Sequence, residues 1–301
     1  MIKNKGVLFG FIAYFLWGIF PIYFKLIKAV PADQIVFHRV VWSFLLLGLL
    51  LSVRKEWKPV LQALSQPKTL ARYALAGLLL AVNWLTSVWG VNAGHIVETS
   101  LGYFINPLVS VALGVIILRE RLRPLQWLPV LLAAAGVLYL TLQYGALPWI
   151  ALVLAFSFGL YGLVKKLSPL GSLHGLTLET GILLLPSVAY LLFAEVQGQG
   201  AFGHISPGMN LMLALSGGIT TLPLLLFSSA ARSIPLTLIG LLQYIAPTGQ
   251  FLIGVLVYKE PFTPVQMIGF GIIWLALIIF SLEGYTHHRR IVLNAREALK
   301  A

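Results

Sequence analysis

Arg39 and Glu179 are charged residues set within long apolar stretches of the chain, 140 residues apart. An ionisable side chain in such a stretch is costly unless it is paired or hydrated, so both are candidate functional residues. The planar guanidinium of Arg39 could bind a carboxylate or a phosphate, and each charge could also form an ion pair. Candidate partners are Glu98 for Arg39, and Lys165, Lys166 or Arg232 for Glu179.

Polar and aromatic side chains gather in the same apolar stretches. Buried amides need hydrogen-bond partners, which a hydrated cavity or a neighbouring helix can supply. Aromatic rings can stack on a flat or amphipathic ligand, or they can simply pack or anchor the chain at an interface. The candidates for the wall of a ligand cavity are Tyr14, Trp17, His38, Arg39, Trp42, Asn83, Trp84, Trp89, Asn92, Tyr103, Asn106, Tyr161, Gln243, Tyr244 and Gln250.

The composition places these residues in a membrane. Hydrophobic residues make up 59% of the 301 residues and charged residues only 10%, against about 25% in an ordinary soluble domain. So little charge cannot cover a soluble protein, which excludes a soluble enzyme and a disordered chain. The chain has no cysteine, so it has no disulfide or thiol nucleophile. Its net charge of +12 comes from short clusters rather than one basic face, so no nucleic-acid partner is expected.

Ten apolar runs are long enough to cross a bilayer, since a helix needs about 20 residues to span about 30 Å of hydrocarbon. We therefore expect an all-α membrane protein. The predicted helices cover residues 6–26, 34–53, 72–93, 98–118, 125–143, 148–165, 174–194, 210–231, 235–257 and 264–283. The stretch 58–64 could form a short interfacial helix, but we expect an ordinary loop there.

The distribution of Lys and Arg predicts the orientation, because these residues concentrate in cytoplasmic segments. With the N-terminus in the cytoplasm, 17 of the 21 basic residues fall inside and three outside. Ten spans then leave the basic tail, residues 284–301, in the cytoplasm as well. Arg39 lies about six residues, or 9 Å, below the outer end of its helix, and Glu179 lies about as far from the inner end of its own. We therefore do not expect these two charges to pair with each other.

The sequence also contains an internal repeat. Residues 101–126 and 241–266 match at eight of 26 positions without a gap, at an offset of 140 residues. Each repeat, residues 1–143 and 144–283, then holds five helices. Because five is odd, the second repeat enters the membrane from the opposite side. An inverted repeat of this kind is typical of secondary transporters, whose halves move around a central site to open it to either face.

The transporter hypothesis gives several of these residues a role. Arg39, Glu98 and Glu179 are interpreted as gating residues at the two mouths of the pathway. Pro107 and Pro247 occupy equivalent positions and should kink their helices, so they are candidate hinges. Structural roles are the alternative: a stable bundle for the duplication, snorkelling for Arg39, and stabilisation of the start of its own helix for Glu98.

Proton coupling is a further possibility, and His38 is the candidate residue because histidine titrates near neutral pH. The neighbouring charge of Arg39 disfavours its protonation. A lone histidine beside an arginine is more often a packing residue that makes a hydrogen bond. Proton antiport and facilitated diffusion therefore both stay open.

Several stretches resemble the EamA-type transporters of the drug/metabolite transporter superfamily. One is the Trp17-Gly18 pair, and another is the proline, glutamate and glutamine pattern that closes each repeat. The resemblance is closest to RarD-type members. It is carried by AYFLWGIFPIYFKLI (13–27), VPADQI (30–35), HRVVWSF (38–44), SLGYFINPLV (100–109), LAFSFGLYGLVKK (154–166) and QYIAPT (243–248). It covers nearly the whole chain and implies a ten-helix exporter of small metabolites in the bacterial inner membrane.

Motifs for other functions are absent from the sequence. It contains no GxxxxGK[ST] loop for ATP, and no HExxH or GxSxG motif, so no cofactor, metal or catalytic residue is expected. The main prediction is a secondary transporter that exports amino acids, amphipathic drugs or related small metabolites by alternating access. A membrane-embedded enzyme acting on a lipid-linked substrate and a passive channel or uniporter are the alternatives.

Overall fold

The computed structural model describes residues 2–93, 95–145, 147–259 and 263–298, without the side chains of residues 2–4, 92, 96, 97, 144, 285 and 287–298. This part of the chain is helical and contains no strand. Its elements are α1 (Ile2–Gly18), α2 (Phe20–Leu26), α3 (Ala32–Arg54), α4 (Lys58–Leu64), α5 (Pro67–Asn92), α6 (Ile96–Ile116), α7 (Pro124–Tyr144), α8 (Trp149–Leu167), α9 (Ser172–Val196), α10 (Pro207–Ser233), α11 (Leu236–Gln243), α12 (Ile245–Leu252), the π-helical turn η1 (Ile253–Val257) and α13 (Pro264–Ala298).

Ten stretches of helix in the described residues are long and apolar enough to cross a membrane. α1 and α2 together form the first, α11, α12 and η1 form the ninth, and eight long helices form the others. The ten predicted spans are therefore confirmed, with boundaries within a few residues, except where the helices of the third and the tenth spans extend further. The chain is a multi-pass membrane protein.

Four long helices begin with a proline, which suits the first helical position because its missing N–H would have no partner there. These helices begin at Pro67, Pro124, Pro207 and Pro264. Glutamines reinforce two of the starts. The Gln126 side chain accepts a hydrogen bond from the backbone N–H of Arg123 (2.9 Å), and Gln266 accepts one from Thr263 (3.1 Å). The glutamine that recurs after each proline is therefore a capping residue.

The predicted loop at 58–64 is wrong, because this stretch forms α4. Val60 and Ala63 lie on its buried face and pack in a cluster with Leu51 and Tyr73. Leu61, on the opposite face, is exposed. The buried face has only two residues in about two turns, which is too short a pattern to identify from the sequence.

Two spans are interrupted. The first breaks at Ile19, between α1 and α2, and the ninth breaks at Tyr244, between α11 and α12. The second break fits Pro247, whose ring clashes with the carbonyl of residue 243, four positions earlier. The equivalent Pro107 lies inside α6 without interrupting it. The two candidate hinges therefore differ: the helix breaks near Pro247 but continues through Pro107.

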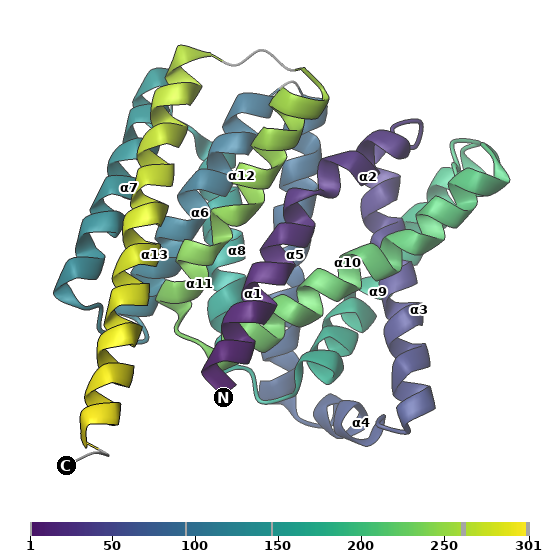
Figure 1. Cartoon of the computed structure of the whole chain (residues 1–301). Coiled ribbons are helices and arrows are strands. Elements are labelled where there is room, and N and C mark those ends of the chain that lie inside the picture. The colour runs from purple at the N-terminus through teal and green to yellow at the C-terminus, as the bar shows by residue number, and fades with distance from the viewer. Residues whose placement is uncertain (1, 94, 146, 260–262, 299–301) are drawn as a thin grey trace.

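Figure 1 shows both termini and α4 at one end of the bundle, called here the lower end, and the α2–α3 and α9–α10 connections at the other, the upper end. Four pairs of helices begin 140 residues apart: α3 and α9, α5 and α10, α6 and α11, and α7 and α13. In three of these pairs (α3–α9, α6–α11 and α7–α13) the two members pack against each other. The two members of the remaining pair make similar contacts: α5 packs against α8, the first long helix of the second half, and α10 packs against α1, the first helix of the first half.

Candidate functional site

A cavity of about 540 Å³ lies between the helices that come from both halves of the chain. Its lining begins at the exposed residues Lys28 and Val91 of the upper end and reaches the buried Asn83 and Gln243. Most of the wall is aromatic or aliphatic, with a few amides and hydroxyls. A volume of this size suits a small organic molecule.

Nine of the fifteen predicted cavity residues lie on this wall. They come from six helices and include the amides expected to face a hydrated space. The nine are Tyr14, Trp17, Arg39, Asn83, Trp84, Tyr103, Asn106, Gln243 and Gln250. Whether they bind a substrate stays a prediction.

The sequence analysis missed several lining residues. Phe20, Phe24 and Lys28 line the cavity on the same side as Trp17. Their spacing of three, seven and eleven residues from Trp17 is that of one helix face. This helical spacing from Trp17 is a sequence signal that could have identified these three residues as lining residues.

Arg39 reaches the cavity wall from α3 and is 8% exposed. Its Nε donates a hydrogen bond to Oγ1 of Thr220 (2.7 Å), and its guanidinium carbon lies 4.4 Å from the Trp84 ring. A ring at this distance stabilises a cation through its π electrons. Within the described residues no carboxylate lies within 4 Å of Arg39, and its predicted partner Glu98 is engaged elsewhere.

Glu98 binds the start of α8, not Arg39. Its Oε1 accepts a hydrogen bond from the backbone N–H of Ile150 (2.7 Å). The first N–H groups of a helix have no partner within the helix and carry partial positive charge, which favours a carboxylate. Glu98 also lies in the first turn of its own helix α6, where a carboxylate stabilises the positive helix end. The gating role of Glu98 stays a prediction.

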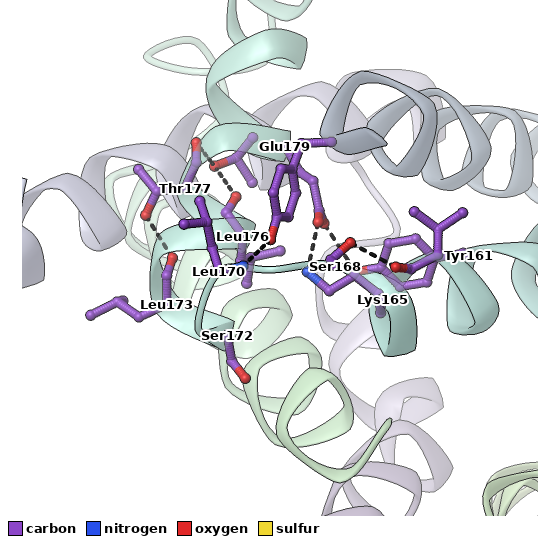
Figure 2. Close-up of polar contacts among 12 residues, drawn as sticks. Tyr161, Lys165, Ser168, Leu170, Ser172, Leu173, Leu176, Thr177 and Glu179 are labelled. Atoms are coloured by element: carbon purple, nitrogen blue, oxygen red, sulfur yellow. Dashed lines mark hydrogen bonds and ion pairs between the residues drawn. The ribbon is translucent and has the colours of Figure 1, made fainter. Parts of the chain in front are cut away.

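Glu179 lies in a buried ion pair with Lys165. Figure 2 shows Tyr161 and Lys165 of α8 reaching Glu179 of α9. Lys165 Nζ lies 2.6 Å from Oε1 of Glu179, and the Tyr161 hydroxyl donates to Oε2 (3.1 Å). The Lys165 and Glu179 side chains are only 2% and 0% exposed. Of the three candidate partners, the structure pairs Glu179 with Lys165, while Lys166 donates to the backbone carbonyl of Ile234 (2.6 Å).

An aromatic layer separates the cavity from this ion pair. Trp17, Tyr14, Phe158, Phe227 and Tyr161 contact one another with ring centroids 5.3–6.1 Å apart. The first three also line the cavity, whereas Tyr161 is fully buried and hydrogen-bonded to Glu179. Tyr161 therefore belongs to the layer that closes the cavity, not to its wall.

His38 and Trp42 are also placed away from the cavity. They lie one turn apart on α3 and face a second crevice, where both contact the ring of Phe202. Successive helix residues are about 100° apart around the axis. With Arg39 facing the cavity, its neighbour His38 points elsewhere, which weakens the assignment of a proton-coupling role to His38.

Three further predicted cavity residues have other outcomes. Trp89 is 49% exposed and stacks on His95, so it is placed like an anchor at the membrane surface. Tyr244 is buried in a separate cluster with Phe104 and Phe270. The side chain of Asn92 lies outside the described residues.

The cavity provides binding surfaces, namely aromatic faces, amides and one guanidinium. In the described part of the chain, no three His, Asp or Glu side chains come together as a metal site would require. The arrangement can therefore hold a small molecule that has an apolar part and a polar part.

Similar proteins include RarD proteins and proteins named as transporters. Over 289 residues the chain is 46% identical to the protein RarD of Salmonella typhi, covering 95% of this chain and 98% of the relative. Over 284 residues it is 46% identical to the uncharacterized transporter YojE of Bacillus subtilis, covering 93% and 94%. A solved crystal structure shares the fold with a TM-score of 0.69 at 17% identity, over 92% of this chain and 97% of the other.

The family assignment rests on similarity that extends over nearly the whole length of the chain. The model of the EamA-like transporter family matches twice, over residues 4–142 and 147–282. RarD proteins from other bacteria are similarly close, among them that of Escherichia coli at 44% identity over 95% of this chain. The chain therefore belongs to the EamA-like transporter family.

Proposed function

We propose that this protein is a secondary transporter that exports small metabolites, such as amino acids or amphipathic drugs, across the bacterial inner membrane by alternating access. The observation that carries the proposal is the cavity within the membrane-spanning helices, whose exposed lining residues among those described, Lys28 and Val91, lie at the upper end. At its lower end the aromatic layer and the Lys165–Glu179 pair close it. An access path closed on one side is what alternating access requires.

We propose further that residues 1–143 and 144–283 are inverted five-helix repeats. Equivalent helices begin 140 residues apart, and several of them pack against each other, as expected around a two-fold axis between the halves. The family model matches each half separately. Five helices per half give the two copies opposite directions through the membrane.

The proposed orientation places the lower end in the cytoplasm. Both termini lie at this end, together with α4 and the basic connections around it (Figure 1). The 17-to-3 distribution of basic residues supports this assignment. The structure then represents a state that is open to the outside and closed to the cytoplasm.

In this scheme the Lys165–Glu179 pair is the cytoplasmic gate. Both residues lie in the second half, on α8 and α9. Movement of α8 against α9 would separate the two charges and open the cavity toward the cytoplasm. Water that enters the opened path would then hydrate the two separated charges and offset the free energy lost when the ion pair breaks.

Transport by the purified protein in liposomes tests the proposal. We expect saturable flux of one or more labelled amino acids or drugs, which unlabelled substrate on the far side accelerates. Flux that rises linearly with concentration would instead indicate a channel. Glu179→Gln should reduce the flux, whereas the matched change Glu195→Gln, at an exposed position of the same helix, should not. An imposed pH gradient in the same vesicles tests proton coupling.

A further inference from the structure

The two ends of the pathway carry different charges at equivalent positions. At the offset of 140 residues, Glu179 corresponds to Arg39, and its partner Lys165 corresponds to Lys25. The lower end therefore holds one cation and one anion that neutralise each other (Figure 2). At the upper end both equivalent positions carry a cation, and of these two only Arg39 lies on the cavity wall.

We propose that the substrate carries an anionic group, a carboxylate or a phosphate, which binds Arg39 and neutralises the upper end of the pathway. The inference rests on the proposed transport function and names the chemical class of its substrate. Arg39 lies on the cavity wall and has no carboxylate within 4 Å among the described residues. An anion bound there would supply the counter-charge that Arg39 lacks.

The charges of the cavity wall support an anionic ligand. Arg39 and Lys28 are the cations on the wall, and among the described lining residues there is no Asp or Glu. Only Nε of Arg39 has a hydrogen-bond acceptor in the described part of the chain. The Nη atoms are left with donors for a ligand, and a guanidinium binds carboxylate and phosphate oxygens through two parallel hydrogen bonds.

The surroundings of Arg39 hold its charge without neutralising it. The Trp84 ring lies 4.4 Å and the Phe24 ring 5.7 Å from the guanidinium carbon. These contacts offset part of the cost of burying a cation, and they fix the orientation of the side chain.

The rest of the cavity suits the remainder of such a substrate. The walls supply aromatic faces from Trp17, Phe20 and Tyr103, which can bury an apolar group. The Asn106 side chain is 7% exposed, and its Oδ1 has no hydrogen-bond partner among the described residues. A buried amide oxygen favours a ligand that donates a hydrogen bond. The expected substrate is therefore an amphipathic anion that also carries a donor.

The absence of cysteine makes a direct test possible, because one introduced thiol is then the only one in the protein. Val88→Cys places that thiol on the cavity wall, where a membrane-impermeant maleimide reports access from the upper end. Gln197→Cys, at an exposed position of the same end, is the control. The ligands tested are phenylacetate and phenyl phosphate as anions, phenylacetamide as a neutral analogue, and phenethylamine as a cation.

We expect both anions, or at least one, to protect the thiol at position 88. At about 10 mM, a ligand with a Kd of about 1 mM occupies most sites and should slow labelling about tenfold. The neutral amide and the amine should leave the rate unchanged, as should every ligand at position 197. Equal protection by phenylacetamide, or no protection by either anion, contradicts the proposal.

Variants of Arg39 complete the test. Arg39→Gln should abolish protection by the anions, and Arg39→Lys should retain part of it because the charge is kept. If Arg39→Gln fails to fold, the charge-retaining variant and the neutral ligands still decide the question. Protection that survives in a folded Arg39→Gln protein overturns the proposal. Saturable transport of neutral compounds without anion protection would do the same while leaving the proposed transport function intact.

Discussion

Glu179 and Arg39 occupy the same position in the two halves of the chain, yet their surroundings differ in kind. Glu179 has its counter-charge and a hydroxyl donor within the protein, and it is completely buried. Arg39 has a hydroxyl and aromatic rings around it but no carboxylate among the described residues, and it faces a cavity. The two halves that we propose as repeats place these charges at equivalent positions. Differences in a few side chains make the lower end complete by itself and leave the upper end suited to an added anion.

The largest expected effect comes from breaking the lower pair. Lys165→Met would leave Glu179 buried without a counter-charge, and removing one partner of a buried pair costs about 3–5 kcal/mol. The double variant Lys165→Met with Glu179→Gln should recover most of that loss, because neither charge remains. Unfolding by denaturant in detergent micelles measures both. Additive losses in the double variant would show that the two side chains do not act as a pair.

Helix packing around the two charges sharpens the comparison. A Cβ at Gly217 would clash with the backbone of Trp42, on the helix that carries Arg39. A Cβ at the equivalent Gly77 would lie 3.4 Å from the backbone oxygen of Glu179, which is an ordinary contact. Gly217→Ala should therefore cost about 1–3 kcal/mol, because α3 and α10 would have to move apart.

Gly77→Ala is the matched control for that substitution. Alanine favours helix over glycine by about 1 kcal/mol, so this variant should be neutral or slightly more stable. Thermal unfolding of both proteins in the same detergent gives the comparison. Equal losses of thermal stability in Gly217→Ala and Gly77→Ala would contradict the inference that the helices pack more closely at Gly217 than at Gly77.

Much of this architecture could be predicted from the sequence, because the hydropathy of long runs and the prolines at helix starts are local signals. Nine wall residues were found because polar and aromatic side chains stand out in apolar helices. His38 was predicted to line the cavity, but it faces the second crevice. The direction of each side chain on α3 depends on how the helix is rotated about its axis, and a sequence does not specify that rotation. The partner of Glu98 is a backbone group 52 residues away, and no local pattern indicates such a contact.

Reversing the charge at Arg39 tests whether the ends differ by charge alone. Arg39→Glu puts a carboxylate at the position equivalent to Glu179, on a cavity wall where Lys28 is then the remaining cation among the described lining residues. The upper end should then close without an anion, and labelling of a cysteine at position 88 should slow about tenfold, which corresponds to about 1.4 kcal/mol. Adding Lys28→Gln, which removes that remaining cation, should restore the labelling rate. No change in labelling would mean that the charges do not control closure.

The smallest expected effect concerns the two prolines. Pro247 accompanies a break between α11 and α12, whereas α6 continues through Pro107. Pro247→Ala removes the clash with the carbonyl of residue 243 and lets the helix reform, so the balance between open and closed states should shift by about 0.4–1 kcal/mol. That shift changes the labelling rate at position 88 about two- to fivefold. Pro107→Ala should leave the rate unchanged, because its helix needs no rearrangement, and equal effects at both positions would assign the same hinge role to each half.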